Sequence, residues 1–360
     1  MEKQNLFDIR IKKPDRNIYT EAKKQWDSIS KPLDGLGDFE NIICQIAAIQ
    51  KELCPDIYAR TLIVFCADNG IVAHGVTQSE QDVTRKVAIA LGESRSAASV
   101  IAKGVKANVL PVDIGINCED KISGVLDMKV AHGTKDFLSS SAMTEKQTLQ
   151  AIECGIELAR EQKKAGAGLL ATGEMGIGNT TTSSAVLAAI LKLDSEKMVG
   201  RGAGLDDIKL QNKREVVRMG IEKYADVFNH IDDEADRSFE ILRCLGGLDI
   251  AAMCGVFIGG AIYGVPVVID GVISSVAALL AQIFVPGTKE YMIASHGGRE
   301  AGLEIALKKL GLRPLINGNM ALGEGTGALM IFPLLDNALY LYRHGTRFAD
   351  NEIEDYERFC

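Results

Sequence analysis

Residues 61–67 read Thr-Leu-Ile-Val-Phe-Cys-Ala and run directly into Asp68-Asn69-Gly70. A continuous apolar run of this length, closed by a turn signal, is typical of a strand that is buried on both faces. Further runs of this form occupy 107–112, 167–172, 265–269 and 291–294, and helix-like segments lie between them at 94–104, 144–166, 183–193 and 274–284. The alternation predicts an α/β fold with a mainly parallel, Rossmann-like sheet and helices on both faces.

The regions that flank these runs suggest how the chain is divided. Residues 1–60 read as a small helical domain or cap, interrupted by a loop at 31–38 that contains Pro32 and two glycines. The C-terminal residues 335–360 could complete this small domain. Residues 61–334 would then form the large α/β catalytic domain.

One segment, 251–269, has no charged residue and is long enough to cross a bilayer. It also contains several glycines and Pro266, and it ends in the β-branched run 265–269. A buried helix, a turn at Gly264 and a buried strand explain this pattern better. We therefore expect no interaction with a membrane.

Composition argues against several classes of protein. The net charge is −8, and no run of Lys and Arg is long enough to follow a phosphate backbone, so nucleic-acid binding is not expected. The eight cysteines contain no C-x-x-C pair and the five histidines no H-E-x-x-H cluster, so no metal site is predicted. Scattered cysteines and the lack of a secretory signal indicate a cytoplasmic protein.

Polar residues follow every apolar run. They are Asp68, Asp113, Glu174 and Asp270 after the first four runs, and Ser295 with His296 after the fifth. Because ligands bind outside the carboxyl ends of parallel strands, these residues predict a polar cleft. Each acidic residue could instead cap the helix that follows it. His296, expected in a glycine-rich turn, could either contact a ligand or have a structural role.

The richest motif reads Gly-Glu-Met-Gly-Ile-Gly-Asn-Thr-Thr-Thr-Ser-Ser at 173–184. It follows a strand and opens a helix, so its backbone N–H groups and hydroxyls would form a cradle for a phosphate or carboxylate. The binding candidates are Gly176, Gly178, Asn179, Thr180 and Thr181. Neither a Walker loop nor a dinucleotide fingerprint is present, since Thr181 replaces the third glycine of G-x-G-x-x-G. The alternative is a simple helix N-cap.

A second glycine loop reads Gly-Arg-Gly-Ala-Gly-Leu-Asp-Asp at 200–207. Arg201, with Gly202 and Gly204 after it, would suit an anionic ligand. The pair Asp206-Asp207 could equally form the first turn of the next helix. An acidic pair followed by Thr-Thr-Gly, which marks diphosphate-binding transferases, is absent, so a magnesium–diphosphate substrate is not indicated.

The third motif, Leu-Gly-Glu-Gly-Thr-Gly-Ala at 322–328, places Glu324 between glycines. It follows a turn-rich run at 316–319 and precedes an apolar, helix-like run at 328–341. Glycine on both sides lets the backbone approach a ligand closely. Glu324 is therefore either a solvated loop residue or a functional carboxylate at the mouth of a helix.

Together these motifs resemble one family, the nicotinate-nucleotide–dimethylbenzimidazole phosphoribosyltransferases of cobalamin synthesis. The runs at 173–181 and 322–328 are the longest and most specific. The matching stretches follow the family order: Lys31-Pro32, Leu36-Gly37, 67–70, 112–115, 173–181, 200–207, 246–253, Asp270-Gly271, 294–296 and 322–328.

The resemblance implies a reaction without metal or cofactor. Nicotinate mononucleotide would exchange its nicotinate, at the ribose C1′, for a nitrogen of an aromatic base such as dimethylbenzimidazole. Glu324 would be the general base, and Glu174 would orient the substrate or stabilise charge. The loops at 176–181 and 202–204 would hold the phosphate, the ribose and the nicotinate.

The same resemblance implies a homodimer, whose interface could come from the apolar helix 251–262 or from the N-terminal helices. Residues 34–38, Asn69, 297–302 and 317–320 depart from the commoner family pattern. The preferred base is therefore open, and a relative specific for phenols or other bases, or a weakly catalytic partner chain, is the alternative. A non-catalytic nucleotide-binding protein and a nicotinamide oxidoreductase are further classes.

Overall fold

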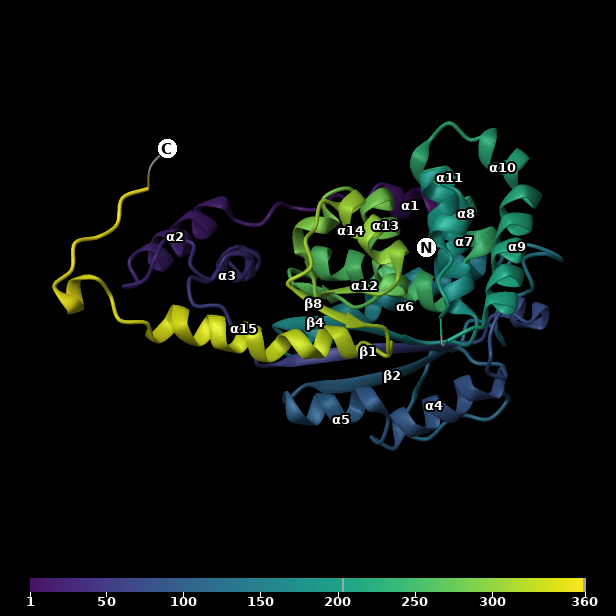
Figure 1. The fold of residues 1–360 in the computed structure, drawn as a ribbon, viewed down its shortest axis with the longest axis horizontal. Helices are drawn as coiled ribbons and strands as arrows, with labels where there is room; N and C mark the ends of the chain where they lie inside the picture. The colour runs from purple at the N-terminus through teal and green to yellow at the C-terminus, as the bar shows by residue number, and fades with distance from the viewer. Residues whose placement is uncertain (203, 359–360) are drawn as a thin grey trace.

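The computed structural model describes residues 1–202 and 204–358, so Ala203 of the second glycine loop and the last two residues of 335–360 lie outside it. Its centre is a six-stranded parallel sheet in the order β3-β2-β1-β4-β5-β6 (Figure 1). The strands are β1 (Arg60–Ala67), β2 (Asn108–Gly115), β3 (Leu126–Asp127), β4 (Leu169–Met175), β5 (Val267–Ile269) and β6 (Met292–Ala294). The predicted parallel α/β fold is confirmed, and the short, exposed β3 was not expected.

Helices cover both faces of this sheet (Figure 1). One face carries α6 (Glu145–Lys164), α7 (Asn179–Leu191), α12 (Leu248–Tyr263) and α13 (Val272–Phe284), and the other carries α4 (Asp82–Gly92), α5 (Ala97–Gly104) and α15 (Thr326–His344). In β1, Ile63 and Phe65 pack into the first core, whereas Leu62 and Val64 pack into the second. Because side chains alternate along a strand, burial of both faces requires a continuous apolar run.

The apolar stretch that imitates a membrane span forms α12, a left-handed turn at Gly264 and β5, as expected. Helix α12 packs against α6 through Gly155 and Gly255, where a Cβ on either glycine would overlap the backbone of the other helix. This close approach explains the glycines in an otherwise apolar segment. In the described part of the chain, no helix combines the length and apolar character that a bilayer span requires.

The remaining elements include a second, two-stranded parallel sheet of β7 (His296–Gly298) and β8 (Ile316–Met320). Two expectations were wrong here, because the run at 316–319 is a strand rather than a turn, and His296 begins a strand. The other helices are α1 (Lys3–Phe7), α2 (Arg16–Asp27), α3 (Asp38–Gln50), α8 (Ser195–Met198), α9 (Asp207–Lys223), α10 (Ala225–Asn229), α11 (Glu234–Leu245) and α14 (Ala301–Leu310), with 3-10 turns η1 (Gly70–His74), η2 (Thr288–Tyr291) and η3 (Ala349–Asn351).

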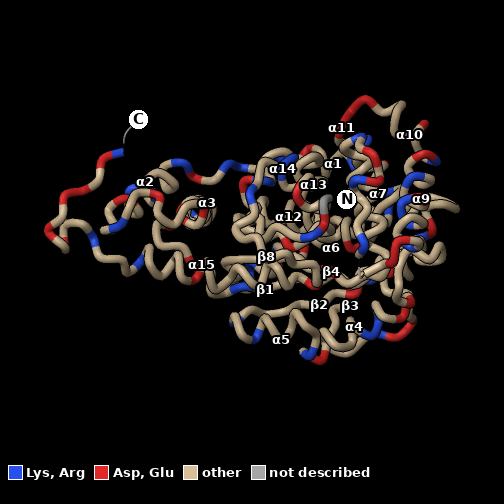
Figure 2. The backbone as a smooth tube through the Cα atoms, in the orientation of Figure 1, with Lys and Arg blue, Asp and Glu red and all other residues tan. Residues whose placement is uncertain are grey.

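Helices α2 and α3 pack together beside the C-terminal part of α15, which extends beyond the sheet to reach them (Figure 1). The rings of Trp26 and Tyr342 join α2 to α15, with centroids 5.1 Å apart. Glu40 is fully buried and pairs with Lys23 at 3.3 Å and Lys31 at 2.6 Å. Along the described chain Lys and Arg are interspersed with Asp and Glu (Figure 2).

Candidate active site

A cavity of about 370 Å³ opens at the carboxyl ends of β4 and β5. It collects most of the residues that the sequence predicts for the site: Glu174, Gly176, Gly178, Asn179, Thr180, Arg201, Gly202, Asp270, His296 and Glu324. Asp68 and Asp113, at the ends of β1 and β2, do not line it. The ends of β4, β5 and β6 therefore contribute to the cavity, whereas the two acidic residues after β1 and β2 serve elsewhere.

Four of the predicted site residues lie outside the cavity lining: Asp68, Thr181, Gly204 and Ser295. Asp68 accepts a hydrogen bond from the backbone of Asn117 at 2.8 Å. Thr181 is fully buried within α7. Ser295 Oγ lies 2.8 Å from Nδ1 of His296, and it is the His296 residue, not Ser295, that lines the cavity.

Glu324 sits in a strained loop at the start of α15. Its φ is +57°, and Gly323 and Gly325 on either side have φ of +89° and +80°. Three successive left-handed residues turn the carboxylate toward the N-terminus of α5, where Oε2 accepts a hydrogen bond from the backbone of Ala98 at 3.2 Å. Gly173 lies directly beneath, and a Cβ there would be 2.7 Å from the Glu324 carbonyl oxygen. Such strain is typical of functional positions.

Asp270 explains how this loop is held. Its carboxylate accepts hydrogen bonds from the backbone N–H groups of Gly325 at 3.2 Å and Ala328 at 3.1 Å. Asp270 is thus a cap, but of the distant α15 rather than of α13, the helix that follows it. Burial raises the pKa of Asp270 to about 6, and the backbone donors oppose that rise. His296 packs against the same turn, at Gly327, and burial lowers its pKa, which favours a neutral ring.

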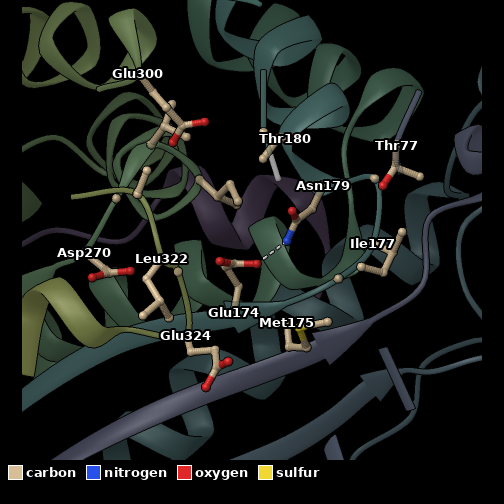
Figure 3. Close-up of a pocket in the computed structure, with 18 of the residues that line it drawn as sticks. Thr77, Glu174, Met175, Ile177, Asn179, Thr180, Asp270, Glu300, Leu322 and Glu324 are labelled. Carbon is tan, nitrogen blue, oxygen red and sulfur yellow. Dashed lines mark hydrogen bonds between the residues drawn. The ribbon is translucent and has the colours of Figure 1, made fainter. Parts of the chain in front are cut away.

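Glu174 lines the cavity together with the carboxylates of Glu324, Asp270 and Glu300. It receives a hydrogen bond from Nδ2 of Asn179 (Figure 3). The same nitrogen donates to Oδ2 of Asp249 at 3.0 Å. Burial, reinforced by the nearby Asp249, raises the pKa of Glu174 to about 8, and the Asn179 bond opposes the rise. Figure 3 shows its carboxylate directed away from that of Glu324.

A buried lysine faces the threonines of the first glycine motif. Lys213 of α9 is 1% exposed and donates from Nζ to Thr180 Oγ1 at 2.8 Å and to the Gly200 carbonyl at 3.2 Å. Burial lowers the pKa of Lys213 to about 8, whereas Glu300, also in the cavity lining, acts to raise it. Beside the start of α7, this ammonium forms one wall of an anion-binding corner.

In the second glycine loop, the Arg201 side chain bonds to nearby residues of the same segment. Arg201 donates to the Leu205 carbonyl at 2.9 Å and pairs with Asp207 at 2.5 Å. Asp206 accepts a hydrogen bond from the backbone of Lys209, so it caps α9. The alternative reading of the acidic pair as the first turn of a helix is correct, and Asp207 in addition neutralises part of the charge of Arg201.

Part of the remaining cavity wall is apolar. Val83 and Val87 of α4 lie in the same lining as Met175 and Leu322 (Figure 3 labels the last two). Helix α4 precedes α5, toward whose N-terminus the Glu324 carboxylate is turned. A flat aromatic ring could pack in this slot, within the same cavity as Glu324.

Comparisons with known proteins agree with this geometry. The family model described as "Phosphoribosyltransferase" matches residues 11–353. The chain is 40% identical, over 93% of its length and 94% of the relative, to the nicotinate-nucleotide–dimethylbenzimidazole phosphoribosyltransferase of Acetivibrio thermocellus. It belongs to the nicotinate-nucleotide–dimethylbenzimidazole phosphoribosyltransferase family. The enzyme of that name from Clostridium acetobutylicum is 37% identical over 95% of this chain and 96% of its own.

Two solved structures have the same fold as this chain. CobT from Thermus thermophilus superimposes with a TM-score of 0.87 at 34% identity, covering 94% of this chain and all of that one. A second structure, of the nicotinate-nucleotide–dimethylbenzimidazole phosphoribosyltransferase from the same organism, gives a TM-score of 0.86 at 33% identity, covering 94% of this chain and 99% of its own. The likeness therefore extends over most of the chain.

Sequence reasoning missed several residues that line this cavity or contact its lining. Lys213 lies in the middle of α9, where its spacing looks like that of an ordinary surface lysine. Asp249 was noted only as part of the matching stretch 246–253. The Ala98 N–H is a backbone donor, for which a sequence carries no signal. Ser96 is the N-cap of α5 and is the only sequence signal for where this helix begins.

Proposed function

We propose that the chain transfers the 5-phosphoribosyl group of nicotinate mononucleotide to 5,6-dimethylbenzimidazole or a similar aromatic base. The bond between C1′ and the nicotinate nitrogen breaks, and a bond between C1′ and a nitrogen of the incoming base forms. The proton of that base passes to Glu324. The products are the α-riboside 5′-phosphate and nicotinate. The pyridinium leaves as a neutral ring, so the step requires no further activation of the leaving group.

One observation carries this proposal: a single cavity joins an anion corner, the carboxylates of Glu174 and Glu324, and an apolar slot. The phosphate would lie at the start of α7, where Thr180 and the Lys213 ammonium supply donors. Glu324 faces the α4–α5 side of the slot, where it can accept the proton of a base. Glu174, when ionised, would stabilise the positive charge that develops on the ribose.

The proposal is tested by incubating the purified chain with nicotinate mononucleotide and a panel of bases, namely dimethylbenzimidazole, benzimidazole, adenine, phenol and p-cresol. Riboside phosphates are identified by mass spectrometry. We expect product with the benzimidazoles. Product with phenols alone would assign the chain to the phenol-specific alternative. No product with any base, although nicotinate mononucleotide binds, would favour the weakly catalytic partner chain.

We further propose that the enzyme is a cytoplasmic homodimer. Helix α12, one of the expected interfaces, is buried inside the subunit and is unsuitable. Exposed apolar side chains instead follow one face of α15 at Met330, Leu334 and Tyr340. They form an apolar stripe on the exposed side of the helix, interrupted by Asn337, that a second subunit could cover. The described cysteines are free thiols, which supports a reducing compartment.

A further inference from the structure

A second buried carboxylate lies behind Glu174. Asp249, in the first turn of α12, is 0% exposed and faces Asn179 of α7. The amide nitrogen Nδ2 of Asn179 donates one hydrogen bond to Oδ2 of Asp249 and another to Oε2 of Glu174. The two carboxylates therefore share one amide group. Glu174 lines the substrate cavity, whereas Asp249 does not.

The surroundings of this pair contain no compensating cation among the described residues. The ionisable groups that face it are Cys66 of β1, Asp68 directly after β1, Asp270 after β5 and Glu324 from the loop before α15. In the described part of the chain, neither carboxylate of the pair forms an ion pair with Lys, Arg or His. Lys213 donates to Thr180 and Gly200 instead. Two adjacent buried carboxylates without a cation cannot both ionise cheaply.

An unpaired acceptor indicates where a proton can reside. Oδ1 of Asn69 is buried and has no hydrogen-bond partner among the described residues. A Cβ on Gly247 would touch both this oxygen, at 2.9 Å, and Oδ1 of Asp249, so both oxygens face Gly247. A proton on Asp249 would place a donor on the side of Gly247 that the orphaned oxygen of Asn69 also faces. Burial raises the pKa of Asp249 as well as that of Glu174, in agreement with this arrangement.

We propose that Asp249 is a positioning residue that holds Glu174 through Asn179 and shares one proton with it in the empty enzyme. The pair releases this proton when a cationic pyridinium ribotide enters the cavity. The inference rests on the proposed function, because the cation is that of nicotinate mononucleotide.

The released proton prepares the cavity for the reaction. Entry of the positive ring favours ionisation of Glu174, since an opposite charge nearby stabilises the carboxylate. As the C1′–nicotinate bond breaks, the positive charge moves to the ribose and Glu174 remains ionised beside it. When the neutral nicotinate and the riboside phosphate leave, the pair takes a proton back from water. The pair therefore regains its proton in each cycle, and the only net proton released is the one that the incoming base gives to Glu324.

Calorimetry on the wild-type chain tests the first half of this proposal. Binding of nicotinate mononucleotide is measured near neutral pH in two buffers of different ionisation enthalpy, and the difference gives the number of protons released. We expect net release approaching one proton per site. Binding without proton release would overturn the inference while leaving the proposed function intact. A chain that neither binds nor turns over nicotinate mononucleotide would refute the proposed function itself.

Two variants test the role of Asp249. Asp249→Asn keeps an acceptor for Asn179 but removes the charge, so the released proton should be lost and the acid limb of kcat/KM should move to lower pH. Asp249→Ala also removes the acceptor, so kcat should fall at every pH. Asp113→Asn changes a buried carboxylate outside the cavity and is the matched control. It should alter neither the number of protons released on binding nor the acid limb of kcat/KM. An unmoved acid limb in Asp249→Asn would contradict the proposal.

Discussion

At the scale of single residues, burial of charge dominates this site. Glu174 is enclosed at the end of β4, and its pKa rises from 4.5 to about 8 because burial penalises the ionised form. Between about pH 4.5 and pH 8, Glu174 therefore keeps a proton in the folded chain that it has already lost in the unfolded chain. The free energy of unfolding must then fall as the pH rises through this range, because only the folded state holds the proton.

Glu174→Gln should remove this pH dependence. Glutamine can still accept the hydrogen bond from Asn179 but does not titrate. We expect the variant to be more stable than the wild-type enzyme near pH 8, by on the order of 1 kcal/mol or more, and the gain to shrink toward about pH 5. Urea denaturation at several pH values measures this. A gain that is equal at both ends of the range would show that Glu174 is not held neutral.

Thr180 and Thr181 are adjacent in α7 but have different surroundings. Thr180 contacts Lys213 in the anion corner, whereas the Oγ1 of Thr181 is buried without a partner among the described residues. Thr180→Val should weaken binding of nicotinate mononucleotide by roughly tenfold, the loss of one hydrogen bond to a charged group. Thr181→Val is the matched control and should leave the affinity unchanged. Calorimetry distinguishes them, and equal affinities in both variants would place the phosphate elsewhere.

At the scale of elements, the start of α15 is where packing and backbone strain meet. Gly325 has φ of +80°, and a Cβ there would overlap the side chain of Leu62 in β1. The strand that defines the sheet therefore also fixes the loop that carries Glu324. The Asp270 carboxylate completes the arrangement by capping the helix from the end of β5.

Gly325→Ala should therefore lower both stability and kcat. Gly311, at the end of α14, has a similar φ of +75° but open space around it, so Gly311→Ala measures the backbone strain alone. That strain should cost roughly 1–2 kcal/mol. Thermal unfolding should show a larger loss for Gly325→Ala, and only this variant should lose activity. Equal losses in both would mean that the contact with Leu62 is unimportant.

Particular elements show what a sequence can predict. The strands of the large sheet were recognised because burial of both faces demands continuous apolar runs, as in Arg60–Ala67. Strand β8 was missed because Ile316–Met320 is mostly exposed and polar, and pairs only with β7 among the described strands. Lys213 and Asp249 were missed because their roles depend on contacts between α9, α12 and α7, which local patterns do not encode.

At the scale of the whole molecule, α15 links the catalytic sheet to the helical cluster of α2 and α3. The start of this helix carries Glu324, and its far end packs Tyr342 against Trp26. The expected boundary between 334 and 335 therefore falls inside one continuous helix. The division of the chain into two domains stays a prediction. The exposed face of α15 connects both regions and is the surface that the proposed dimer would bury.

The double variant Leu334→Glu with Tyr340→Glu should convert the proposed dimer into monomers. Tyr340 is 64% exposed, so the change places charges on the apolar stripe without disturbing the subunit core. Ile208, 83% exposed on α9, provides the control, and Ile208→Glu should remain dimeric. Light scattering during size-exclusion chromatography gives the masses. A double variant that stays dimeric would exclude this face of α15.

The role of Glu324 is the central claim, and Glu324→Gln tests it most directly. Glutamine keeps the size of the side chain and its acceptor for the Ala98 N–H, but it cannot take a proton from the base. Affinity for nicotinate mononucleotide and turnover with saturating dimethylbenzimidazole are measured on the same preparation. We predict unchanged affinity and turnover at least ~100-fold lower, as for a lost general base. Turnover close to that of the wild-type enzyme would contradict the account.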